Sequence, residues 1–171
     1  MNETMQTLLH RASPRSFKGQ HVSRELLDQI VQAGLKAPSG SNRQTPRFLV
    51  VTNDECVKKL SQLNAAVMGR DTDPFYGARD VIVCLAKKEG TWIYDGSLAM
   101  GNMLNAAYSL GLGGRWIHRA KEVFSSEEGL AILKSLGIED ELEGIGFLIV
   151  GETEEEMVPK DIVEGRVYTI E

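Results

Sequence analysis

The chain has 171 residues, of which 42% are hydrophobic and 25% are charged, and its formal net charge is −5 at pH 7. This length and composition predict a single globular domain over residues 1–171, with enough apolar material for a core. The acidic balance, with a sequence pI near 5.3, argues against a nucleic-acid partner, because nucleic-acid phosphates attract a basic protein face.

The sequence shows no motif typical of a membrane span, a signal peptide or a metal site. No apolar run is long enough to span a membrane, and the N-terminus lacks the basic and apolar regions of a signal peptide, so we expect a cytoplasmic protein without a membrane partner. Cys56 and Cys84 have no CxxC or metal-type spacing, and the three histidines are not paired. We therefore expect free thiols, no structural disulfide and no metal site.

The first chemically informative segment follows a short amphipathic helix predicted at about residues 2–9. Arg11 and Arg15 flank Ser13, and Pro14 keeps this segment from being helical. Two guanidinium groups and a hydroxyl suit a phosphate monoester, because each guanidinium can donate two parallel charge-assisted hydrogen bonds to its oxygens. A solvated basic loop is the alternative interpretation.

A polar loop lies between a helix predicted at about 23–36 and a strand predicted at about 47–53. Its turn formers and uncharged hydrogen-bonding residues are Pro38, Ser39, Gly40, Asn42 and Gln44. The proline fixes one φ, the glycine permits backbone conformations closed to other residues, and the polar side chains offer donors and acceptors. Such a loop suits a flat ligand with polar edges, although an ordinary turn that satisfies its own backbone would look the same.

The rest of the chain predicts helices at about 54–66, 95–111 and 126–136, and strands at about 80–86, 113–117 and 145–151. This pattern indicates an α+β protein, but a parallel doubly wound sheet would fit the same alternation. The helix at about 95–111 carries small residues on every face, which favours close packing. Packing against a second subunit and packing within one chain explain this composition equally well.

The motifs together resemble those of the FMN-dependent nitroreductase family. Its members carry an Arg-x-Ser-x-Arg/Lys-x-Phe segment, matched here by Arg11, Ser13, Arg15 and Phe17. They then carry a Pro-Ser-x-x-Asn-x-Gln loop, matched at 38–44, and a helix that begins near an Asp and ends in Leu-Gly-Leu-Gly, matched at 95–113. The three motifs occur in the family order, and the resemblance extends over nearly the whole chain.

This resemblance implies a nitroreductase-like α+β fold, with a central, mostly antiparallel sheet flanked by helices. It implies an intertwined homodimer with two FMN sites, each built from both chains. It also implies ping-pong transfer of a hydride from NADH or NADPH through FMN to a small-molecule electron acceptor such as a nitroaromatic or a quinone. No side chain is expected to be catalytic, because the cofactor carries the hydride chemistry.

The residues expected to bind the cofactor are those of the two N-terminal motifs, two glycines after the long helix, and two basic residues near the C-terminus. They are Arg11, Ser13, Arg15, Pro38, Ser39, Gly40, Asn42, Gln44, Gly113, Gly114, Lys160 and Arg166.

Two other functions are compatible with the sequence. A flavin-binding protein without efficient turnover, serving as a sensor, carrier or scaffold, would show the same contacts. A small α/β domain that uses the Arg11–Arg15 segment for another phosphate ligand is a more distant alternative. The chain also departs from the resembled family after Gln44, where Thr45-Pro46-Arg47 replaces the Pro and Trp of many members, so the preferred acceptor is open.

Overall fold

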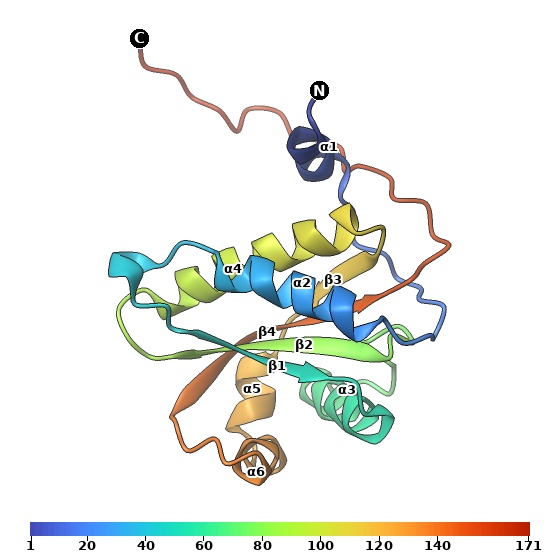
Figure 1. The fold of residues 1–171 in the computed structure, drawn as a ribbon, viewed down its shortest axis with the longest axis vertical. Helices are drawn as coiled ribbons and strands as arrows, with labels where there is room; N and C mark the ends of the chain where they lie inside the picture. The colour runs from blue at the N-terminus through green and yellow to red at the C-terminus, as the bar shows by residue number, and fades with distance from the viewer.

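A four-stranded antiparallel sheet with the strand order β1-β2-β4-β3 forms the centre of the computed structural model, which describes residues 1–171 (Figure 1). The strands are β1 (Pro46–Val51), β2 (Asp80–Lys87), β3 (Gly113–Ile117) and β4 (Leu142–Gly151). The antiparallel pairing confirms the predicted α+β class and rules out the parallel doubly wound alternative.

Helices cover both faces of this sheet (Figure 1). On one face lie α2 (Arg24–Leu35) and α4 (Trp92–Ser109), and on the other lie α3 (Asp54–Met68), α5 (Ala120–Ser125) and α6 (Glu127–Ser135). Helix α1 (Glu3–His10) has no buried residue. Residues 152–171 form an extended and almost wholly exposed segment. No helix is both long enough and apolar enough to cross a membrane.

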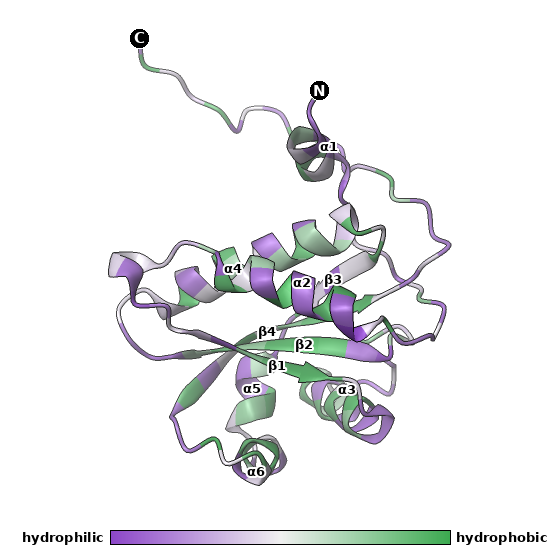
Figure 2. Cartoon of the chain, in the orientation of Figure 1, coloured by the Kyte–Doolittle hydropathy of each residue, from purple (hydrophilic) through white to green (hydrophobic).

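The core consists of two apolar layers separated by the sheet. Strand β2 contributes Val81, Val83 and Leu85 to the layer under α3, α5 and α6, and its alternate residues to the layer under α2 and α4. This alternation follows from the two-residue period of a strand, and the central strands are apolar because both of their faces are covered (Figure 2). Burial raises the pKa of the Cys84 thiol to about 12, so this side chain is neutral and serves as a small core residue.

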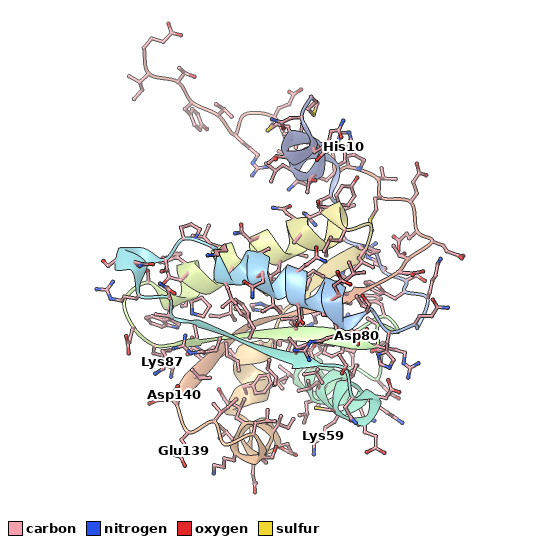
Figure 3. The ribbon with its side chains drawn as sticks, in the orientation of Figure 1. His10, Lys59, Asp80, Lys87, Glu139 and Asp140 are labelled. Carbon is pink, nitrogen blue, oxygen red and sulfur yellow. The ribbon has the colours of Figure 1, made fainter.

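Polar contacts at both ends of β2 connect this strand to other segments of the chain (Figure 3). Asp80, which is fully buried at the start of β2, accepts a hydrogen bond of 2.6 Å from the Val22 N–H and lies 2.9 Å from the His21 ring. At the far end of β2, Lys87 pairs with Asp140 at 3.0 Å. The first contact fixes the segment that leads from the N-terminal motif into α2.

Candidate functional site

The N-terminal motif lines a cleft of about 400 Å³ together with the C-terminal segment. Four predicted site residues meet there, and we call this site the basic cleft: Arg11, Ser13, Arg15 and Lys160. Arg11 Nη1 donates a hydrogen bond of 3.2 Å to Ser13 Oγ. Glu155 and Glu156 line the same cleft. Arg166, which was also predicted to join this cluster, lies exposed in the extended C-terminal segment and does not line the cleft.

Two residues outside the predicted set of cofactor-binding residues hold this segment in place. Arg115 of β3 donates a hydrogen bond of 2.8 Å from Nη1 to the Ser13 carbonyl, and its guanidinium lies 5.1 Å from the centroid of the Tyr76 ring. Glu155 accepts a hydrogen bond of 2.6 Å from the Arg15 N–H. The N-terminal motif is therefore fixed from both sides through its backbone, which leaves its basic side chains available for a ligand.

Gly113 and Gly114 were predicted to face a ligand, and the structure places both in β3, buried. A side chain at Gly113 would lie 2.7 Å from Pro14 Cγ, and one at Gly114 would lie 3.2 Å from the methyl group of Ala107. Packing within the chain therefore requires a glycine at the first position and favours a small residue at the second. Gly113 has the clearer link to the basic cleft, because it allows the N-terminal segment to lie against β3.

The second predicted cluster forms a tight loop that includes the single-turn 3-10 helix η1 (Gly40–Asn42). We call residues 38–44 the polar loop. Ser41, Asn42 and Gln44 have φ values of 52°, 53° and 51°, in the left-handed region, which costs about 1–2 kcal/mol for each non-glycine residue. Ser39 Oγ accepts a hydrogen bond of 3.0 Å from the Gln44 N–H, and Asn42 Oδ1 accepts one of 3.0 Å from Gln44 Nε2.

Gly40 has a different role from the one that the sequence suggested. The positive φ values fall on its neighbours, and Gly40 is a glycine because a Cβ there would collide with the Thr91 hydroxyl. Its N–H donates a hydrogen bond of 2.9 Å to Asp95 Oδ1 and is thus directed into the protein.

Asp95, in the first turn of α4, connects the polar loop to this helix through hydrogen bonds. Its side chain is 2% exposed and accepts hydrogen bonds from the Gly40 N–H (2.9 Å), the Thr91 hydroxyl (2.9 Å) and the Thr45 hydroxyl (3.1 Å). Burial raises the pKa of this carboxyl, but the three hydrogen bonds and the nearby charge of Arg43 outweigh burial, so the pKa lies below its ordinary value. Asp95 is therefore a buried carboxylate at neutral pH.

The polar loop borders a small cavity of about 100 Å³. Pro38, Ser39 and Gln44 line it, together with Arg47, whose Nη1 donates hydrogen bonds to the carbonyls of Gln44 (2.8 Å) and Pro46 (3.0 Å). Gly40 and Asn42 do not line it. Three of the five residues predicted in this loop thus share one surface.

One chain does not bring the two clusters together. The polar loop is bonded to the start of α4, whereas the basic cleft is bonded to β3, which follows the end of α4. Helix α4 has 18 residues, which corresponds to about 27 Å at the ordinary helical rise. The two clusters therefore lie at opposite ends of this helix (Figure 1).

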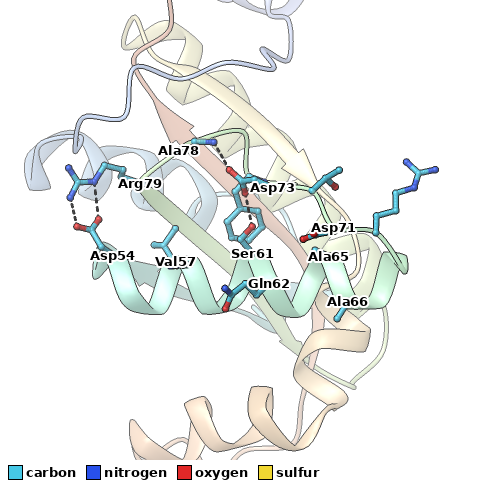
Figure 4. A pocket seen from close by; sticks show the side chains of 15 residues that line it. Asp54, Val57, Ser61, Gln62, Ala65, Ala66, Asp71, Asp73, Ala78 and Arg79 are labelled. Atoms are coloured by element: carbon cyan, nitrogen blue, oxygen red, sulfur yellow. Dashed lines mark hydrogen bonds and ion pairs between the residues drawn. The ribbon is translucent and has the colours of Figure 1, made fainter.

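A separate cavity of about 640 Å³ lies between α3 and the segment at 70–79, and contains none of the predicted site residues (Figure 4). Four of its polar residues form two pairs. Arg79 pairs with Asp54, and the Ser61 hydroxyl donates a hydrogen bond of 2.6 Å to Asp73. Both pairs join α3 to the segment at 70–79.

Comparison with known proteins gives consistent matches. Residues 8–81 match the profile of the Nitroreductase family. A protein of Archaeoglobus fulgidus, provisionally named an NADH dehydrogenase/NAD(P)H nitroreductase, is 30% identical over 170 residues, which cover 96% of this chain and 91% of the relative. A protein of Methanothermobacter thermautotrophicus with the same provisional name is 33% identical over 119 residues, which cover 67% of this chain and 60% of the relative.

A solved structure shares the fold along the entire chain. The crystal structure of a nitroreductase with bound FMN from Desulfitobacterium hafniense has a TM-score of 0.89, is 27% identical in sequence, and is matched over 100% of both chains. The four-stranded antiparallel sheet with its two helical layers is thus the fold of that protein as well.

The lowered pKa of Asp95 predicts a pH-dependent contribution to stability. The native state binds fewer protons at this carboxyl than the unfolded chain, so its contribution is complete above the ordinary pKa of about 4 and is lost as the pH falls through the lowered value. Asp95→Asn should lower the free energy of unfolding by about 1–3 kcal/mol near neutral pH. Urea unfolding followed by tryptophan fluorescence measures this free energy. The difference between the variant and the wild type should become smaller below about pH 4.

Asn64→Ala provides the control, because it removes a buried side chain that donates 2.7 Å to the His118 carbonyl and has no titrating group. The difference in free energy of unfolding between Asn64→Ala and the wild type should stay constant over the same pH range. If the difference for Asp95→Asn is equally constant, the assignment of an ionised Asp95 is contradicted.

Proposed function

This chain belongs to the nitroreductase family, and we propose that it is an FMN-dependent oxidoreductase that takes a hydride from NADH or NADPH and reduces an electron-poor small molecule. Two findings support this: a relative named for NAD(P)H nitroreductase activity, matched over 91% of its length, and the FMN-bound structure that is matched along the entire chain. We place the protein in the cytoplasm, where its electron donors are available.

The observation that carries the proposal is the basic cleft, whose groups fit the phosphate of FMN. Arg11, Arg15 and Lys160 form no ion pair with any carboxylate of the chain. Their charges are thus available to a dianionic phosphate, and the Ser13 hydroxyl adds one more donor. Glu155 is occupied by the backbone of Arg15, which reduces its competition with an anion.

The polar loop supplies the groups that a flavin ring needs. Ser39, Asn42 and Gln44 carry hydroxyl and amide groups that can pair with the carbonyl and N–H edge of the ring. When bound, FMN supplies the group that accepts and then donates a hydride, so the chain needs no nucleophile, acid, base or metal of its own. The protein has to bind the ring, orient it and leave one face open to the donor and then to the acceptor.

The distance between the two clusters leads us to propose a homodimer with shared sites. The spacing set by α4 exceeds the length of one FMN molecule, so one chain cannot offer both clusters to the same cofactor. A two-fold axis across the middle of α4 would place the start of this helix beside the end of its copy. The polar loop of one chain would then meet the basic cleft of the other.

The exposed side of α4 suits such a contact. Tyr94 is 72% exposed and Leu98 49% exposed, and Gly101 follows on the same face with open space above its Cα. Residues at this spacing form one stripe on a helix. Two copies of this apolar, small-residue stripe can pack closely.

The visible spectrum of the purified protein tests the function directly. After reconstitution with FMN, we expect flavin absorption bands that bleach on anaerobic addition of NADH or NADPH and return when a quinone or nitroaromatic is added. Bands that persist with both nucleotides would favour a flavin-binding protein without turnover. Failure to bind FMN at all would refute the assignment.

Arg11→Ala tests the phosphate site. Loss of a charge-assisted contact should weaken FMN binding by more than about 1.5 kcal/mol, or roughly tenfold in Kd. Fluorescence titration of FMN measures this change. Arg24→Ala is the matched control, because Arg24 is exposed on α2 and pairs with Asp28, away from the cleft; it should bind FMN like the wild type. An unchanged Kd for Arg11→Ala would remove this residue from the site.

A further inference from the structure

The polar loop concentrates backbone strain to a degree seen nowhere else in the chain. Three of its seven residues are non-glycine residues with positive φ, and only Tyr76 and Arg119 share this property elsewhere. A loop with this conformation needs contacts that hold it, because a relaxed backbone would return these residues to negative φ. The sources of those contacts therefore decide whether the loop keeps its shape.

Most hydrogen bonds of the loop form within it or with Arg47 at the start of β1, and none of these reaches α4. Arg43 Nη1 donates to the Gly40 carbonyl at 3.3 Å, and Arg47 Nη1 donates to the Gln44 carbonyl at 2.8 Å. The Ser39 and Asn42 side chains likewise bond to Gln44. These bonds determine the conformation of the loop, but they do not determine its position relative to α4.

Asp95 connects both ends of the loop to α4. Oδ1 accepts from the Gly40 N–H near the start of the loop, and Oδ2 accepts from the Thr45 hydroxyl directly after its end. Thr91, one turn earlier, donates to Oδ1 and fixes the orientation of the carboxylate. Because Asp95 is 2% exposed, water does not compete for these bonds.

We propose that Asp95 is a positioning residue for the flavin-binding loop, a carboxylate clamp that holds Ser39, Asn42 and Gln44 in place before the cofactor arrives. This inference rests on the proposed FMN function. The carboxylate is needed because its two oxygens accept from all three donors and its charge strengthens each bond, whereas an amide in its place has one acceptor oxygen and no charge. Asp95 does not itself contact the ring, since its oxygens are occupied by the protein.

Asp95→Asn tests the clamp with two readouts. The first uses the protein without FMN: trypsin should cleave after Arg43, inside the loop, faster in the variant than in the wild type. The second is FMN titration well below the unfolding temperature, in which the Kd should rise at least about tenfold, the change expected when a buried, charge-assisted network is broken. Asn64→Ala is the control: it should be destabilised, with the wild-type cleavage rate at Arg43 and the wild-type Kd.

The outcomes separate this inference from the proposed function. A wild type that binds no FMN refutes the function itself, whatever the variants do. If the wild type binds FMN, faster cleavage together with a raised Kd supports the clamp. A change in only one readout, or in neither, overturns it.

Thr45→Val provides a second variant should Asp95→Asn fail to fold, because it is nearly isosteric and removes a single hydrogen bond to Oδ2. It should change both readouts in the same direction by a smaller factor. Wild-type values for a folded Thr45→Val protein would likewise overturn the clamp.

Discussion

The length and placement of helix α4 constrain every other part of the site. One side of this helix is buried against the sheet through residues such as Ala99, Met100 and Met103, so the helix cannot shift without opening the core. The polar loop is bonded to its first turn, and the strand that fixes the basic cleft follows its last turn. The separation of the two clusters is therefore built into the fold. This separation is the reason why we propose a site shared between two chains.

The two clusters are preorganised in different ways. In the basic cleft, the backbone is fixed by Arg115 and Glu155, while the side chains of Arg11, Arg15 and Lys160 stay without ion-pair partners. In the polar loop, the backbone is held in a strained form by a buried carboxylate. The first arrangement suits a charged group that is attracted from a distance, and the second suits an uncharged ring whose hydrogen-bonding edge must be matched closely.

Local patterns in the sequence predicted most of the fold. Strand β3 was predicted at 113–117 and occurs there, because Gly111 ends the preceding helix and Trp116 and Ile117 are apolar. Two helices begin close to where they were predicted, at about 23 and 126. Ser23 and Ser126 cap them by accepting hydrogen bonds from the N–H groups of Leu26 and Gly129. Helix α5 was not predicted, because its six residues are too few to show a helical period.

The parts of the site that the sequence did not reveal depend on contacts between distant residues. Asp95 meets Gly40 across 55 positions, and Arg115 meets Ser13 across 102. The helix motif at 95–113 includes Asp95, but no local pattern shows which distant residues Asp95 and Arg115 contact. The special backbone conformation expected of Gly40 was wrong for the same reason, since the contact that requires a glycine there is with Thr91.

Subunit complementation tests the shared site most directly. Arg11→Glu places a negative charge in the basic cleft, and Ser39→Trp fills the polar loop, so each variant alone should lose FMN. In a mixed dimer, one site pairs the altered cleft with the altered loop and cannot bind FMN. The other site pairs the intact loop of the Arg11→Glu chain with the intact cleft of the Ser39→Trp chain. A refolded equal mixture should therefore regain about a quarter of the wild-type FMN capacity, the share expected for random pairing in a two-fold dimer. A mixture that forms dimers but regains no FMN would contradict a site built from two chains.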